Sequence, residues 1–194
     1  MQTYKIVIAG DGGVGKSSLL HRYVAGQFNR SYSVTIGADF ASREVDLGDE
    51  TIRLVIWDLA GQRRFHVVRD GFYRGAKVVI LVFDITNPES WEDLSLWEKE
   101  ISQQVPGAQI VIVGNKTDLD HQREIPHKLA CGWAKQRRYG YVETSCATGA
   151  GVDDLFVGIA HLVVSYESPI KRANSSSATS SSNFLKRGNG RCNP

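Results

Sequence analysis

The chain has 194 residues, of which 42% are hydrophobic and 23% are charged, and its formal net charge is +2. This length suits one domain with a short appendage, and this composition excludes a collagen-like or wholly disordered chain. The longest apolar run, residues 78–83, is much shorter than the roughly 18 residues that a membrane-spanning helix needs. No secretory signal is recognisable near the start, so we expect a cytoplasmic protein.

The basic residues are concentrated toward the end of the chain. Residues 168–194 contain five Lys and Arg residues and no Asp or Glu, so the preceding part carries a net negative charge. Because a nucleic-acid-binding domain concentrates Lys and Arg on its folded surface, we expect no nucleic-acid partner. The three cysteines are too few and too scattered for a disulfide framework or a zinc cluster.

Segments typical of strands alternate with segments typical of helices. Branched and aromatic residues predict strands at residues 4–9, 52–57, 78–83, 109–113 and 141–144. Between them, apolar residues recur at helical spacing. These residues are Leu19, Leu20, Tyr23 and Val24; Trp91, Leu94, Trp97 and Ile101; Leu129, Ala130 and Trp133; and Val152, Leu155, Phe156, Ile159, Leu162 and Val163. Asn87 before Pro88 is a candidate helix N-cap.

One connection predicts an antiparallel pair. Only three residues separate the strand-like segments 40–47 and 51–57, whereas a parallel crossover needs about a dozen. We therefore expect an α/β fold: a mostly parallel six-stranded sheet with one antiparallel edge strand and helices on both faces. We expect this domain to span residues 1–168, and the serine-rich, basic residues 169–194 to form a flexible tail.

The loop after the first predicted strand carries a phosphate-binding motif. Residues 10–17 read GDGGVGKS, between a strand and a helix as this motif requires. Glycines let successive backbone amides turn toward a phosphate, and the positive end of the following helix adds to the attraction. We expect the nucleotide to contact Gly12, Gly13, Val14, Gly15, Lys16, Ser17 and Ser18. A glycine-rich turn without a ligand is the alternative, and the complete motif argues against it. With this motif, the expected α/β fold is of the P-loop NTPase type.

A second motif follows the strand at residues 109–113. The sequence Asn115-Lys116-Thr117-Asp118 resembles the guanine-specificity element of the Ras-like GTPases. In that family the aspartate carboxylate accepts hydrogen bonds from the ring N–H and the exocyclic amine of guanine. Adenine lacks this pair of donors, and leaving a buried carboxylate unpaired costs about 1–3 kcal/mol. The resemblance makes Asp118 the residue that recognises guanine, beside Asn115 and Lys116.

The same resemblance implies the catalytic and metal-binding residues. Residues 57–62, WDLAGQ, are similar to the second switch of the family, and Thr35 is similar to the threonine of the first switch. The implied Mg²⁺ site comprises Ser17, Thr35 and Asp58. For catalysis, the family assigns the terminal phosphates to Lys16, a γ-phosphate contact to the Gly61 amide, the metal contact to Thr35 and the attacking water to Gln62.

Two further elements concern the base. The segment 143–149 resembles the Thr-Ser-Ala-Lys loop of many relatives, which implies that Ser145, Cys146 and Ala147 contact the nucleotide, with an amide to the guanine carbonyl oxygen. Ala147 has no long side chain to lie along the base, and we expect Cys146 to be a small buried thiol. The family also implies that Phe28 packs edge-on against the base, with a role as a core anchor as the alternative.

Within the superfamily, several segments look most like the Rab branch. They are residues 36–40, 73–76 and 81–87, and the resemblance extends over about residues 4–166. The chain departs from the usual Rab pattern at Ala38, Leu59 and Arg63. Arg63 with Arg64 could serve as a catalytic arginine in cis, although adjacent arginines on a mobile segment more often bind water or a partner.

We therefore expect a Rab-like GTPase that binds GTP and GDP with Mg²⁺ and hydrolyses GTP slowly. Its expected partners are effectors at the switch regions 30–40 and 60–74, an exchange factor and a GTPase-activating protein. A guanine-nucleotide-binding module with negligible hydrolysis is one alternative; a P-loop ATPase or kinase is another, which Asp118 opposes. Cys192 is a candidate for reversible lipid attachment to the cytosolic face of a membrane, although two residues follow it where a prenylation motif has three.

Overall fold

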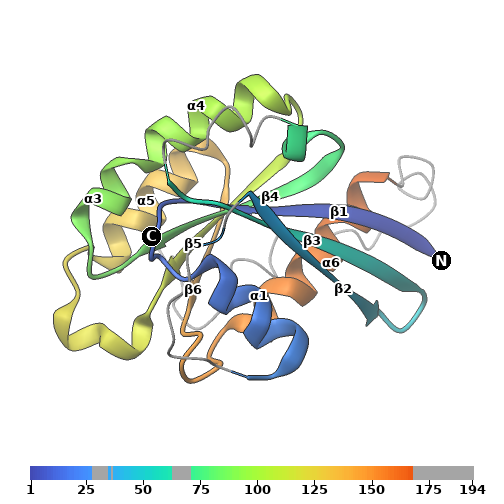
Figure 1. Ribbon diagram of the computed structural model, residues 1–194, viewed down its shortest axis with the longest axis horizontal. Coiled ribbons are helices and arrows are strands. Elements are labelled where there is room, and N and C mark those ends of the chain that lie inside the picture. The colour runs from blue at the N-terminus through green and yellow to red at the C-terminus, as the bar shows by residue number, and fades with distance from the viewer. Residues whose placement is uncertain (28–34, 36, 63–70, 168–194) are drawn as a thin grey trace.

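The computed structural model describes residues 1–27, 35, 37–62 and 71–167, which form a central sheet with helices packed against it (Figure 1). The six strands lie in the order β2-β3-β1-β4-β5-β6. They are β1 (Gln2–Ala9), β2 (Ala38–Asp46), β3 (Thr51–Leu59), β4 (Ala76–Asp84), β5 (Gln109–Asn115) and β6 (Gly140–Thr144). Only β2 and β3 pair antiparallel. The predicted sheet with one antiparallel edge strand is confirmed.

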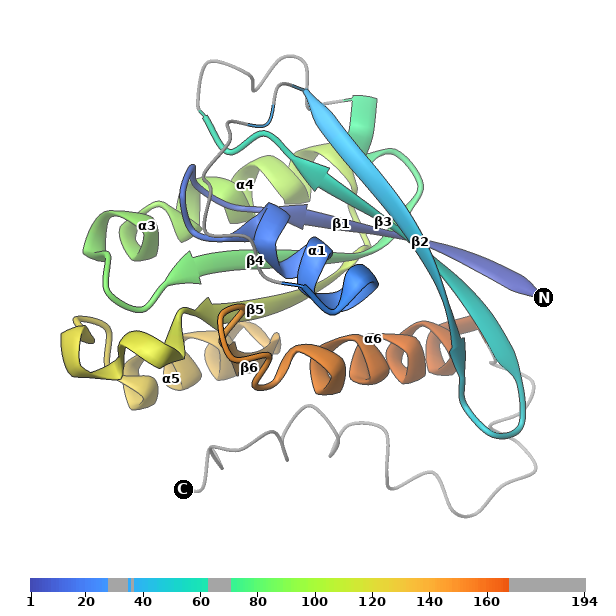
Figure 2. The same ribbon diagram turned by 60° about the horizontal axis from the view of Figure 1, so that its bottom comes forward.

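The helices cover both faces of this sheet. They are α1 (Lys16–Ala25), α3 (Pro88–Glu92), α4 (Leu94–Gln104), α5 (His127–Arg137), α6 (Val152–Glu167) and the short 3₁₀ helix η2 (Thr117–Gln122). Helices α1 and α6 lie on one face, and α4 and α5 lie on the other, as the two views agree (Figure 1, Figure 2). Parallel strands buried on both faces read as continuous apolar runs, which explains the sequence of β4.

The two hydrophobic cores are divided by the sheet. In β1, Ile6 and Ile8 pack toward α1 and α6, whereas Val7 and Ala9 pack toward α4. This alternation follows from the period of two along a strand. Because five of the strands run parallel, their carboxyl ends lie along one edge of the sheet, and the loops that leave them are brought together there.

The helices differ from the sequence prediction in two details. The apolar stripe of residues 91–101 is divided between α3 and α4, which meet at Asp93. Leu129 and Val24 were predicted to belong to buried stripes, but their exposed fractions are 51% and 40%. Smaller neighbours, including Ala130, fill the inner face of α5. The Asn87 cap is confirmed, because its side chain accepts hydrogen bonds from the Glu89 and Ser90 amides.

The predicted tail, residues 169–194 with Cys192, lies outside the described residues, as do Phe28, Arg63 and Arg64. No helix within the described ranges is long and apolar enough to cross a bilayer.

Candidate functional site

The phosphate-binding motif forms the turn between β1 and α1. Gly15 is the N-cap of α1 and has a φ of 99°, in the left-handed region that disfavours other residues. A Cβ atom at Gly15 would also overlap the amide nitrogen of the Asn115 side chain. Glycine is therefore required at this position by backbone conformation and by the close approach of a second loop.

Lys16 begins α1 and is buried, with its side chain folded back over the loop. Its Nζ donates a hydrogen bond to the carbonyl oxygen of Asp11 at 2.6 Å. The Asp11 carboxylate in turn accepts a hydrogen bond from Trp97 Nε1 at 2.7 Å, and burial raises the pKa of this carboxyl group. Trp97 thus holds the phosphate loop from α4, which lies on the face of the sheet opposite to α1. The sequence did not indicate this role.

Ser17, Thr35 and Asp58 come together from three separate segments. The Ser17 hydroxyl hydrogen-bonds to Asp58 Oδ2 and lies 3.0 Å from Thr35 Oγ1, which is 3.4 Å from the same carboxylate oxygen. Burial raises the pKa of Asp58. Within the described residues, Asp58 Oδ1 is buried without a hydrogen-bond partner.

This cluster fits a small divalent cation. Mg²⁺ prefers hard oxygen ligands and commonly uses one or two carboxylates together with phosphate oxygens of a substrate. The unsatisfied carboxylate oxygen of Asp58, next to two hydroxyl groups, supplies such a donor set. A cation there would also favour the charged carboxylate, which burial alone disfavours.

Asn115 joins the phosphate loop to the loops at the other end of the site. Its Nδ2 donates to the Val14 carbonyl oxygen at 2.9 Å, and its Oδ1 accepts from the Thr144 hydroxyl at 3.0 Å. The side chain is 1% exposed. Asn115 therefore acts as a structural link between β5, the phosphate loop and β6.

The next residues of the motif are also fixed. Lys116 has a φ of 70°, an uncommon conformation for a residue with a side chain, and its Nζ forms an ion pair with Asp84 Oδ2 at 2.6 Å. Asp118 Oδ1 accepts a hydrogen bond from the Ser145 hydroxyl at 2.5 Å. Asp118, the residue predicted to recognise guanine, thus lies against the 145–147 loop.

Cys146 is enclosed between the two loops. Its side chain is 3% exposed, and its thiol lies 3.4 Å from Asn115 Oδ1. Burial raises the pKa of this thiol to about 11, so it is protonated at neutral pH. The expectation of a small buried thiol is confirmed.

A further network, which sequence reasoning missed, lies at the end of β6, directly before the 145–147 loop. Glu143 accepts two hydrogen bonds from Arg123 at 2.9 and 3.0 Å and one from the Tyr141 hydroxyl at 2.7 Å. Burial alone would raise the Glu143 pKa, but the hydrogen bonds from Arg123, Tyr141 and His127 outweigh it and lower the pKa. No short motif predicts this contact, because its members come from the residue that follows η2, from α5 and from β6.

Comparison with known proteins assigns the chain to a family. The family model described as "Ras family" matches residues 5–165. The chain belongs to the Ras family.

Curated relatives place this Ras-family protein in the Rab branch. It is 38% identical to the Ras-related protein Rab-7a of Paramecium octaurelia over 86% of this chain and 84% of the relative. It is 35% identical to Rab-13 of Rattus norvegicus over 91% and 88% of the two chains, and 37% identical to Rab-4B of the same species over 83% and 76%. The protein is a small GTPase, an enzyme that hydrolyses GTP.

The segment predicted to be the second switch begins directly beside the phosphate loop. A Cβ atom at Gly61 would overlap Lys16 Nζ and would lie 2.6 Å from the Asp11 carbonyl oxygen. Only glycine allows the backbone to approach the loop this closely. Gln62 follows Gly61 and is half-buried.

The Rab-branch protein also carries a row of three aromatic side chains, Phe40, Trp57 and Phe72. Phe40 in β2 is 62% exposed and stacks on Trp57 in β3, with ring centroids 5.1 Å apart. Phe72 also contacts Trp57, with ring centroids 5.6 Å apart. Exposed aromatic side chains that are already held by their neighbours are typical of protein-binding surfaces.

Proposed function

We propose that this GTPase binds GTP and GDP, together with Mg²⁺, between the phosphate loop and the loops that carry Asp118 and Cys146. The observation that carries this proposal is the double contact of Asn115, which ties the two ends of the site together. A nucleotide has a phosphate chain and a base, so a site that holds both must fix the distance between them. Asn115 supplies this connection through buried hydrogen bonds.

At the phosphate end, the amides of residues 12–18 and the Lys16 ammonium group bind the phosphates. Ser17, Thr35 and Asp58 are the residues that would hold Mg²⁺, which neutralises charge on the phosphate oxygens when bound. At the base end, the Asp118 carboxylate accepts hydrogen bonds from the guanine N–H groups. The backbone amides of the loop of Ser145, Cys146 and Ala147 donate to the guanine O6.

For hydrolysis, Gln62 orients the attacking water and the Gly61 amide donates to the γ-phosphate. The closeness of Gly61 to Lys16 and Asp11 supports this placement. We assign the role of a catalytic arginine to no residue of this chain. We therefore expect slow intrinsic turnover that an activating protein accelerates by supplying one.

The same contacts give the protein two states. Thr35 and Gly61 hold their segments through the γ-phosphate end of the site, and hydrolysis removes that attachment. Phe40 and Trp57 lie between Thr35 and Gly61 in the sequence, and Phe72 follows Gly61. This row of aromatic side chains is the surface that we assign to effector proteins. The similarity of the whole chain to Rab proteins supports a role in membrane traffic.

Two measurements test this function. Nucleotide released from the purified, heat-denatured protein is identified by chromatography, and adenine nucleotide would contradict the proposal. Single-turnover GTP hydrolysis is then compared among wild type, Gln62→Leu and Gln104→Leu, an exposed glutamine at the end of α4 that serves as the matched control. We expect only Gln62→Leu to be slow. Equal rates for all three proteins would favour a module that holds nucleotide without turning it over.

Membrane attachment is tested separately through Cys192. We propose that lipidation of this cysteine, with the basic residues of 169–194, gives reversible binding to the cytosolic face of a membrane. Mass spectrometry of the mature C-terminal peptide should detect the lipid, and Cys192→Ser should move the protein from the membrane fraction to the supernatant. An unmodified peptide would contradict this part of the proposal.

A further inference from the structure

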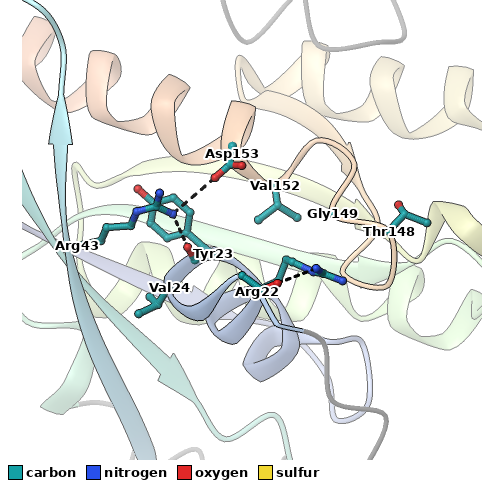
Figure 3. A pocket seen from close by; sticks show the side chains of 9 residues that line it. Arg22, Tyr23, Val24, Arg43, Thr148, Gly149, Val152 and Asp153 are labelled. Carbon is teal, nitrogen blue, oxygen red and sulfur yellow. Dashed lines mark hydrogen bonds and ion pairs between the residues drawn. The ribbon is translucent and has the colours of Figure 1, made fainter.

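Arg22 connects α1 to the loop that faces the base. Its Nε donates to the Cys146 carbonyl oxygen at 2.7 Å, and its Nη2 donates to the Ala147 carbonyl oxygen at 2.6 Å. A third donor, Nη1, contacts the Gly26 carbonyl oxygen at 3.0 Å, at the C-terminal cap of α1. Figure 3 shows the side chain extending from α1 toward the loop that carries Thr148 and Gly149.

These contacts determine where the amides of the loop point. A peptide unit is planar and trans, so its N–H is directed opposite to its C=O. By holding the Cys146 carbonyl, Arg22 directs the Ala147 amide away from itself. By holding the Ala147 carbonyl, it directs the Thr148 amide, which donates to Ser145 Oγ at 3.1 Å. The same Ser145 hydroxyl donates to Asp118.

The loop's own hydrogen bonds fix the remaining peptide unit. The Ser145 carbonyl accepts from the Gly149 amide at 2.8 Å, which orients the Cys146 amide. Three consecutive peptide units are thus held, two of them by Arg22. Arginine suits this position because its guanidinium group presents several donors in one rigid plane, whereas lysine is a point charge on a flexible chain.

A cavity of about 490 Å³ beside Arg22 provides a matched control. Arg43 lines the same cavity and, like Arg22, donates to a backbone carbonyl of α1, that of Tyr23 (Figure 3). Arg43 also lies 3.6 Å from the Asp153 carboxylate. Arg43 makes these contacts instead of binding the carbonyl oxygens of residues 146 and 147. It therefore shares the charge and the surroundings of Arg22 but not its contacts to the loop.

We propose that Arg22 is a positioning residue for guanine: it aims the backbone amides of the 145–147 loop at the base and thereby slows nucleotide release. The inference rests on the proposed guanine-binding function. It also explains how the loop is held although Ala147 has no long side chain to lie along the base. Arg22 itself does not touch the nucleotide in this account.

The experiment measures the dissociation rates of GDP and of 6-thioguanosine diphosphate from wild type, Arg22→Gln, Arg22→Lys and Arg43→Gln. The thio analogue keeps the N–H donors that Asp118 reads, but its sulfur is a weaker acceptor than the guanine O6. Arg22→Gln should release GDP about tenfold faster than wild type. The same substitution should accelerate release of the analogue by only about threefold or less, because the affected amide contact is already weak there.

Arg22→Lys should fall between wild type and Arg22→Gln, and Arg43→Gln should match wild type. Thermal unfolding of each GDP-loaded protein checks folding, and Arg22→Lys carries the test if Arg22→Gln does not fold. An equal acceleration for both nucleotides, or none, would overturn the inference while leaving guanine binding by wild type intact. A wild-type protein that binds neither nucleotide would overturn the proposed function as well.

Discussion

Replacing Asn115 by alanine should damage both the fold and nucleotide retention. The substitution leaves the Val14 carbonyl and the Thr144 hydroxyl without the partners that lie 2.9 and 3.0 Å away. Asn115 is 1% exposed, so water cannot readily replace these contacts. Each unsatisfied buried group costs about 1–3 kcal/mol, so the two groups together give a loss of about 2–6 kcal/mol in the free energy of unfolding. That is a large part of a typical total of about 5–15 kcal/mol.

The assay is urea unfolding of the GDP-loaded protein at two GDP concentrations, which separates the loss of intrinsic stability from weaker ligand binding. Asn87→Ala is the control, since the Asn87 side chain caps α3 with two hydrogen bonds and bonds neither Val14 nor Thr144. This control should cost about 1 kcal/mol and leave GDP release unchanged. The reasoning fails if Asn115→Ala costs no more than Asn87→Ala and releases GDP at the wild-type rate.

Three other substitutions or conditions give further tests. Gly61→Ala places a Cβ against Lys16 and Asp11, and should reduce single-turnover GTP hydrolysis by about a hundredfold through misplacement of the second switch; a wild-type rate would argue against this contact. Burial raises the Cys146 pKa to about 11, so peptide-resolved mass spectrometry should find slow alkylation of Cys146 at neutral pH and faster reaction only in strong base; rapid alkylation at neutral pH would contradict the buried thiol. The lowered Glu143 pKa stabilises the fold above the usual value of 4.5, and this contribution is lost as pH falls through the folded value; urea unfolding should therefore show a smaller acid-induced loss in Arg123→Gln than in wild type, and parallel profiles would exclude the ion pair as the cause.

Much of the fold follows from local sequence patterns. The short connection between residues 47 and 51 fixes the antiparallel pairing of β2 and β3, and continuous apolar runs predict the buried parallel strands. The exposure of Leu129 was not predictable, because helical spacing alone does not say which of several apolar residues faces inward. That choice depends on which helix and strand lie opposite.

The candidate site likewise has a part that the sequence predicts and a part that it does not. Lys16, Asn115 and Asp118 belong to contiguous motifs, and so they are visible in the sequence. The supporting contacts are not, because each joins segments that are distant in the chain: Trp97 to Asp11, and Arg22 to the carbonyl groups of the 145–147 loop. Such contacts depend on tertiary packing, and no spacing rule encodes them.

The most direct test of guanine recognition is calorimetry of wild type and Asp118→Asn with GDP and xanthosine diphosphate. Xanthine presents an oxygen acceptor where guanine has its exocyclic amine, so an amide at position 118 should lose affinity for GDP and gain affinity for xanthosine diphosphate. We expect this exchange of preference in the variant. Undiminished GDP binding with no gain for xanthosine diphosphate would contradict the account.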